Sequence, residues 1–152
     1  MPEGANAATE LKQEHGEIEQ LATRIAALRA CPERTELLRE ANRRFLTHTR
    51  AEERYLLPAV QEHLPAGQQE YVDQLKHTQG IRELIEQLGR ADVDSEEYER
   101  LGTRIAAEIT QHIDRQETVL LPSLLDASPY EESNALGRQL RKGFAEERGT
   151  PD

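Results

Sequence analysis

The spacing of the apolar residues constrains this chain more than any other feature. Apolar side chains recur every three or four positions through four long segments, which is the period of one helix face. No segment alternates with the period of two that a half-buried strand needs. The predicted long helices cover residues 11–30, 33–64, 68–88 and 95–125, and a shorter helix covers residues 129–147.

Short connections between these helices predict an all-α fold: an up-down-up-down antiparallel four-helix bundle with a short extra C-terminal helix that packs outside it. In this scheme residues 1–8 are a disordered N-terminus, residues 9–127 form the bundle, and residues 128–152 form the C-terminal helix and tail. Gly89 is predicted to cap the third helix. Pro58 is predicted to kink the second helix without ending it, because the helical pattern continues beyond it.

Composition and charge restrict the partners. The 152 residues suffice for one domain, and Asp and Glu outnumber Lys and Arg by 29 to 19, which gives a net charge of −10. Such a surface repels phosphate backbones and anionic lipids, so we expect no nucleic-acid partner and no membrane partner. The single cysteine, Cys31, cannot form an internal disulfide, and the N-terminal residues lack the basic and apolar regions of a signal peptide. These features predict a cytoplasmic protein.

An internal repeat organises the histidines. The segments HTRAEERYLLP (residues 48–58) and HIDRQETVLLP (residues 112–122) begin 64 residues apart and share His, Glu, Leu, Leu and Pro at matching places. The other two inner histidines, His15 and His77, are 62 residues apart. The chain is therefore predicted to form two helical hairpins, each with one inward histidine per helix.

Four inward histidines in a bundle core point to a metal site. His48 and Glu52 are four residues apart, so they share one helix face and can converge on one point. Imidazole is a ligand for iron, zinc and copper, and a carboxylate can bridge two cations. A single histidine on an apolar face is more often a hydrogen-bonded core residue. Here that explanation would have to cover four histidines, as well as Glu52, an acid that is unfavourable in a core without a partner.

The second carboxylate is harder to place. Aligning the two LLP endings puts Glu53 opposite Glu117 and Glu52 opposite Gln116. Helical phase favours Glu52 over Glu53 in the first hairpin, although the neighbouring acids leave the choice open. Glu117 is five residues after His112, about 140° away on an ideal helix, so it requires side-chain reach or local overwinding to join the same site. A fifth histidine, His63, is predicted to lie on the surface.

This arrangement resembles the hemerythrin-like domain, also called the HHE cation-binding domain. The resemblance covers about residues 10–125 and rests on the order of the histidines, the two carboxylate spacings and the LLP that follows each pair. It implies a non-haem site of two iron ions with an oxo, hydroxo or water bridge, and Glu52 and Glu117 as bridging ligands. His15 and His48 would then hold one iron, and His77 and His112 the other. The family has His-x4-Asp on its fourth helix, so the five-residue spacing of Glu117 fits.

One departure from the family concerns the third helix. Oxygen-carrying hemerythrins have a second histidine there, whereas this chain has Asp73 one turn before His77 and Ile81 one turn after it. The second iron would then have an extra open position unless another group fills it. The additional candidate ligands are Asp73, Glu53, Glu108 and water.

The resemblance implies binding of dioxygen or a related small ligand, for carriage, storage or sensing. An alternative is a stress protein that reacts with peroxide or nitric oxide, or that stores iron or supplies it for repair; catalysis is left open. Two further alternatives are a metal-free helical interaction module and a bundle with three histidines around one metal, although four histidines and two carboxylates favour two metals. The sequence identifies no protein partner.

Overall fold

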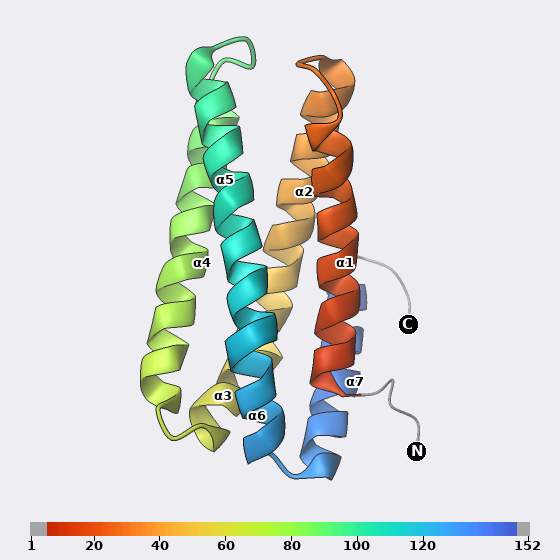
Figure 1. The fold of residues 1–152 in the computed structure, drawn as a ribbon, viewed down its shortest axis with the longest axis vertical. Coiled ribbons are helices and arrows are strands. Elements are labelled where there is room, and N and C mark those ends of the chain that lie inside the picture. The colour runs from red at the N-terminus through yellow and green to blue at the C-terminus, as the bar shows by residue number, and fades with distance from the viewer. Residues whose placement is uncertain (1–5, 149–152) are drawn as a thin grey trace.

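The structure is a computed structural model, and it describes residues 6–148. Over this range the chain is an antiparallel four-helix bundle with a fifth helix outside it and no strand, as the sequence predicted (Figure 1). Two of the four bundle helices are each interrupted by a π-helical turn. The elements in chain order are α1 (Ala7–Ala26), α2 (Pro32–Ala51), η1 (Glu52–Leu56), α3 (Leu57–His63), α4 (Gly67–Arg90), α5 (Glu96–Arg115), η2 (Gln116–Leu120), α6 (Leu121–Ala127) and α7 (Tyr130–Arg148).

The helix ends differ from the predicted ones by a few residues. The α1 helix begins at Ala7, earlier than the predicted boundary at residue 9, because the Asn6 side chain accepts a hydrogen bond of 2.9 Å from the backbone N–H of Thr9. The other residues of the predicted disordered N-terminus, residues 1–5, lie outside the described residues. Gly89 does not cap α4, since the helix continues through it to Arg90.

The two π-helical turns occupy equivalent places in the two repeats, directly before Pro58 and Pro122. In each turn a backbone N–H donates to the carbonyl five residues earlier, from Leu57 to Glu52 and from Leu121 to Gln116. A proline inside an α-helix lacks an N–H and its ring crowds the carbonyl four residues earlier, and a wider turn relieves that clash. Both helices therefore continue past their prolines, as predicted for Pro58. The local change is a widening of the helix, and not the overwinding that was one of the two alternatives for Glu117.

A polar layer divides the bundle core into two apolar clusters. Along α1, Leu11 belongs to the lower cluster, Ile18 belongs to the upper cluster, and His15 lies between them. The helices that contain the π-helical turns repeat this order, whereas α4 contributes only to the upper cluster. The upper cluster contains Phe45 and the isoleucines of α5. The polar layer consists of buried histidine, glutamate and glutamine side chains and is the only such band that crosses the described core: His15, His48, Glu52, Gln74, His112 and Gln116.

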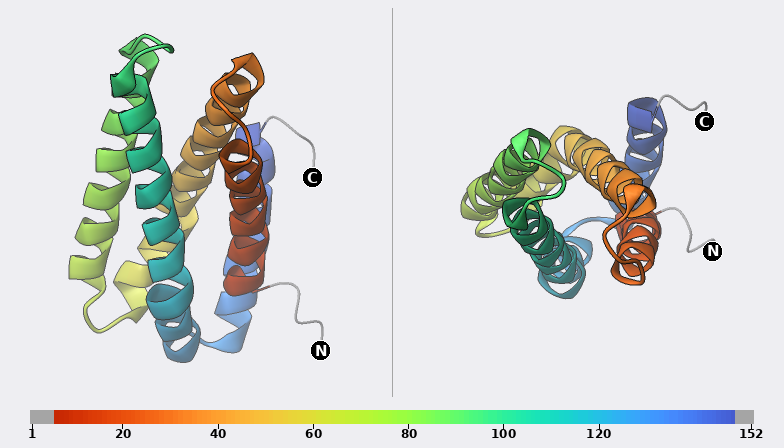
Figure 2. Two further views of the ribbon diagram at one scale, coloured as in Figure 1. Left: turned by 45° about the horizontal axis from the view of Figure 1, so that its top comes forward. Right: turned by 90° about the horizontal axis from the view of Figure 1, so that it is seen from above.

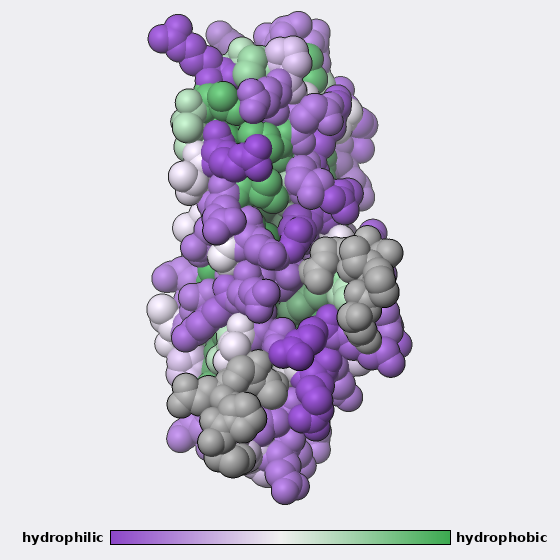
Figure 3. Space-filling view, turned by 90° about the vertical axis from the view of Figure 1, so that its right-hand side faces the viewer, coloured by the Kyte–Doolittle hydropathy of each residue, from purple (hydrophilic) through white to green (hydrophobic). Residues whose placement is uncertain are grey.

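The fifth helix, α7, packs beside α1 and α2 on the outside of the bundle (Figure 2). It was expected to be short, and it has 19 residues against 20 in α1. Its inner face joins the lower apolar cluster through Leu136, Leu140 and Phe144. The side of the molecule shown in Figure 3 is mainly hydrophilic, with hydrophobic surface in its upper half. Within residues 6–148 no helix is long and apolar enough to cross a membrane.

Candidate metal site

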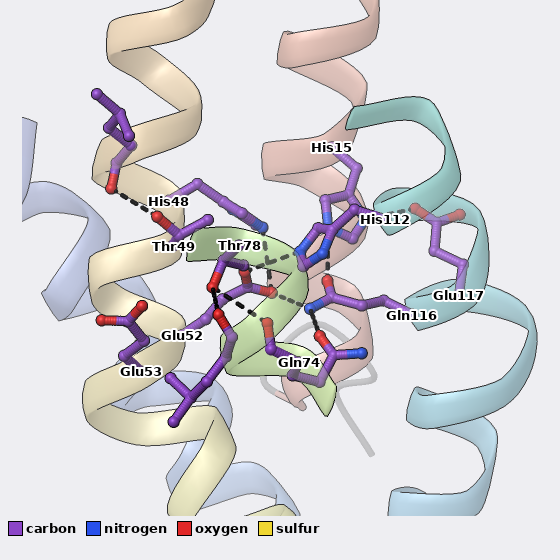
Figure 4. Close-up of polar contacts among 12 residues, drawn as sticks. His15, His48, Thr49, Glu52, Glu53, Gln74, Thr78, His112, Gln116 and Glu117 are labelled. Carbon is purple, nitrogen blue, oxygen red and sulfur yellow. Dashed lines mark hydrogen bonds and ion pairs between the residues drawn. The ribbon is translucent and has the colours of Figure 1, made fainter. Parts of the chain in front are cut away.

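Three of the predicted ligands meet in the polar layer. His15 comes from α1, His48 from the last turn of α2, and Glu52 from the first residue of η1 (Figure 4). Their side chains are almost completely buried, and one potential ligand atom from each lies within 4.8 Å of those of the other two. The ring centroids of His15 and His48 are 4.9 Å apart.

The carboxylate of Glu52 faces both hairpins. Its Oε2 lies 3.3 Å from Nε2 of His48, and its Oε1 lies 3.1 Å from Nε2 of His112. The side-chain amide of Gln116 also donates to Oε2. One carboxylate thus spans a histidine of the first repeat and a histidine of the second, which is the arrangement that a bridging ligand requires.

Glu117 reaches the site from the side. Its Oε2 lies 2.6 Å from Nδ1 of His15, across the bundle on α1, and its side chain is 30% exposed. The residue before it, Gln116, takes the central position opposite Glu52, and its amide oxygen lies 3.1 Å from Nε2 of His15. The structure therefore brings Glu117 to a predicted ligand of the other hairpin and not to His112, from which its spacing had been counted.

His77 lies at the edge of the polar layer. Its ring centroid is 5.6 Å from that of His112, and its Nε2 is 2.9 Å from Oε2 of Glu108. The His77 side chain is 28% exposed, in contrast to the buried His15, His48 and His112. Both His77 and Glu108 line a surface cavity of about 280 Å³ between α4 and α5. The second histidine pair is consequently open to solvent on one side.

The three additional candidate ligands have different surroundings. Asp73 is exposed and accepts a hydrogen bond of 2.8 Å from Gln69, so it is turned away from the site. Glu53 pairs with Arg82 at 2.5 Å between η1 and α4. Only Glu108, of the three, contacts a predicted ligand.

Two buried glutamines were missed as site residues. Gln116 donates to Glu52 and, at 3.3 Å, to the amide oxygen of Gln74. Gln74 is three residues before His77, on the same helix face, and Gln116 holds the repeat position of Glu52. The positions of both glutamines could be derived from the sequence. They were not predicted as site residues because carboxylates and imidazoles, and not amides, are the usual metal ligands.

The fifth histidine lies outside the cluster. His63 was predicted to lie on the surface, but its side chain is only 17% exposed. Its Nε2 is 2.8 Å from Oε2 of Glu132 on α7. The fifth helix thus supplies an ion-pair partner for this residue.

The protein holds two of these groups in the protonation states that a cation needs. Burial, followed by the nearby charge of His48, lowers the pKa of His15 to about 4. Burial alone would raise the pKa of Glu52, but the charges of His48 and His112, with the hydrogen bond to His112, hold it well below the ordinary value. Near neutral pH His15 is therefore neutral and Glu52 is ionised.

The donor atoms themselves fit a cation. A neutral imidazole has one N–H, so His15 can donate to only one of the two acceptor oxygens that face its ring. Both ring nitrogens of His48 and the Nδ1 of His112 are buried, and none has a hydrogen-bond partner among residues 6–148. Buried polar atoms without partners are unfavourable, and a bound metal ion would give lone pairs of this kind a partner. The residues present therefore fit a metal site of imidazole and carboxylate ligands.

The comparisons with known proteins agree with this site. The family model of the hemerythrin HHE cation binding domain matches residues 6–124. The chain therefore belongs to the hemerythrin HHE cation-binding family, and the resemblance inferred from the sequence is confirmed.

A solved structure supports the fold independently. The chain is similar to a hemerythrin HHE cation binding domain-containing protein from Mycobacterium kansasii, with a TM-score of 0.82 and 21% sequence identity. The similarity covers 95% of this chain and 88% of that one. It therefore includes α7, which the family model does not reach. A comparison with the curated proteins gave no match.

Proposed function

We propose that this protein holds two non-haem iron ions and binds dioxygen or a related small ligand at them. The observation that carries the proposal is the position of the Glu52 carboxylate, with one oxygen toward each hairpin. In this proposal His15 and His48 hold one iron, His77 and His112 hold the other, and Glu52 and Glu117 bridge them. Bound iron would supply one-electron chemistry and open coordination positions for the ligand.

The surrounding residues support this role. Phe45 is fully buried above the polar layer, with its ring 5.4 Å from that of His112, and it excludes water from that side. Gln116 donates to Glu52 and so stabilises its ionised form. Glu117 lies 2.6 Å from Nδ1 of His15, so its carboxylate stands beside a residue that would hold the first iron.

A specific observation favours a second candidate, reaction with peroxide or nitric oxide. Asp73 is turned away, and His77 borders the surface cavity between α4 and α5. The second metal position would then have fewer nitrogen donors, and an exchangeable water would occupy part of it. Storage of iron, or its supply for repair, is a weaker alternative because no observation distinguishes it.

The proposal includes the environment in which the site works. The ligand is a small diffusible molecule, and the acidic composition disfavours nucleic acid and membranes as partners. A cytoplasmic location is part of the same proposal.

The test of this function is anaerobic loading with ferrous iron followed by stopped-flow mixing with oxygen. An oxygen adduct that releases its oxygen under vacuum would support oxygen carriage or storage. Rapid irreversible oxidation, together with consumption of added peroxide, would support the second candidate. A protein that takes up no iron and stays colourless would be a metal-free helical module, and the proposal would be wrong.

A further inference from the structure

The C-terminal helix reaches the metal site, although it lies outside the region that the family model matches. Phe144 on α7 is almost completely buried and stacks on the ring of His48, with centroids 5.3 Å apart and planes 7° from parallel. His48 also contacts Phe45, at 6.3 Å and 30°. His48 is thus packed against two phenylalanine rings, one from its own helix and one from α7.

The hydrogen bonds of the site do not orient His48. A metal-binding histidine usually donates its second ring N–H to an acceptor, and this bond fixes the plane of the ring. Within the described residues Nδ1 of His48 has no such partner, and Nε2 faces Glu52 at 3.3 Å without the geometry of a hydrogen bond. His15, in contrast, has oxygens facing both ring nitrogens. Packing against the phenylalanines is the restraint that the structure provides for the His48 ring.

The contacts of α7 hold Phe144 in this position. Gly143 lies so close to η1 that an added Cβ would be 2.7 Å from Cε2 of Tyr55, so a larger residue there would force the Tyr55 ring or the helix to move. Arg141 pairs with the buried Glu10 of α1 at 2.5 Å. These contacts fix the distance and register of the helix against α1 and η1.

We propose that Phe144 is a positioning residue that sets the plane of the His48 imidazole for metal binding. This inference rests on the proposed function, because it assumes that His48 is a ligand. A metal-bound imidazole has an electron-poor ring, which stacks on the face of a phenylalanine more favourably than a free imidazole does. Phe144 then favours the metal-loaded form over the metal-free form, and the C-terminal helix is part of the site.

The experiment measures cobalt(II) binding to full-length Phe144→Leu and Phe144→Met variants. Cobalt(II) alone is the probe, because its visible absorption reports ligand geometry without oxygen chemistry. Leucine and methionine keep an apolar side chain in the space but remove the ring, and methionine adapts to irregular gaps if leucine packs poorly. The matched control is Leu140→Met, an equally buried change on the same helix that leaves the His48 contact intact. The melting temperature of each metal-free variant is recorded beside its affinity.

Loss of an aromatic pair predicts cobalt binding about 2- to 10-fold weaker in both Phe144 variants, with a shifted visible spectrum. The Leu140→Met variant is expected to keep the wild-type affinity and spectrum even where its melting temperature falls. An unchanged affinity and spectrum in Phe144→Leu, or equal changes in Leu140→Met, would overturn the positioning role while leaving the metal site standing. Wild-type protein that binds neither cobalt nor iron would overturn the proposed function as well.

Discussion

The two hairpins carry the same histidine pattern, but they present it differently. In the α1–α2 hairpin both histidines are buried, 1% and 0% exposed for His15 and His48. In the α4–α5 hairpin His112 is buried, whereas His77 is 28% exposed and paired with Glu108. The α1–α2 hairpin thus forms an enclosed half of the site, with Glu52 at its centre, and the α4–α5 hairpin forms a half that is open on one side at His77.

The repeat position after each second histidine shows the cause of this asymmetry. Glu52 and Gln116 occupy equivalent places, and their side chains hydrogen-bond at the centre of the core. Two carboxylates there would repel each other in a buried environment, and an amide removes one of the charges. The second acid, Glu117, is displaced by one residue and approaches His15 from a partly exposed position. The two repeats therefore share their histidines, but their acids lie in different places: Glu52 at the centre of the core and Glu117 at its partly exposed side.

The largest effect is expected from removing a ligand of the enclosed half. His48→Ala should weaken metal binding by more than about 100-fold, because the ligand is fully buried and no neighbour replaces it. His63→Ala is the control, since His63 lies outside the cluster and pairs with Glu132. Metal content after gel filtration measures both. Equal metal loss in the two variants would contradict the assignment of His48 as a ligand and of His63 as a residue outside the site.

Making the two halves alike should destabilise the metal-free protein. Gln116→Glu places a second carboxyl group against Glu52 in the core, and we expect a loss of about 3 kcal/mol in the free energy of unfolding at pH 7. Urea unfolding with and without metal measures the change. Bound metal should recover much of this loss by neutralising both acids.

The matched control for this substitution is Gln111→Glu, which makes the same charge change at an exposed position of α5. It should change the unfolding free energy by less than about 0.5 kcal/mol. If both variants lose the same stability, the central position has no special electrostatic role.

The pH dependence of the metal-free protein tests the enclosed half alone. The pKa of His15 is about 4 in the folded protein and 6.5 in its ordinary state, so the unfolded chain binds more protons between these values. The stability that neutral His15 contributes is present above pH 6.5 and is lost as the pH falls toward 4. Between pH 7 and 5 we expect a loss of about 2 kcal/mol in the free energy of unfolding. His15→Gln should flatten this part of the profile, and an unchanged slope would contradict the assignment.

The smallest effect is expected in the open half, where a histidine can be added. Ile81 is buried one turn after His77, so Ile81→His should slow oxidation of the iron-loaded protein by air a few-fold. Asp73→His should leave the rate unchanged, because that position is exposed and turned away. Stopped-flow absorbance measures both variants against the wild type. Faster or unchanged oxidation in Ile81→His would make water access, and not the missing ligand, the better explanation.

The fold could be predicted because it depends on local signals. The three-to-four spacing specified every bundle helix, and the LLP repeat marked both prolines around which π-helical turns form. The histidines followed from the same periodicity, since each occupies an inward position of its helix. Glu52 could be preferred over Glu53 from helical phase, and the structure places Glu52 in the core and Glu53 against Arg82.

The remaining details depend on contacts between helices, which periodicity does not encode. The direction of Glu117 toward His15 follows from the way α1 packs against the second hairpin. Gln74 faces the polar layer and Asp73 does not, because neighbouring residues lie about 100° apart around a helix and the packing of α4 decides which one points inward. The pairing of His63 with Glu132 and the stacking of Phe144 on His48 both involve α7, whose position outside the bundle was expected but whose contacts were not.

The central claim is that the two unequal halves form one site for two iron ions, and a metal count tests it most directly. The full-length protein is loaded with ferrous iron without oxygen, freed of excess metal, and analysed for iron and protein before an optical spectrum is recorded in air. The account predicts about two irons per chain and a new absorption band when oxygen is admitted. A fully loaded protein with a single metal ion per chain, or one that retains only zinc, would contradict it.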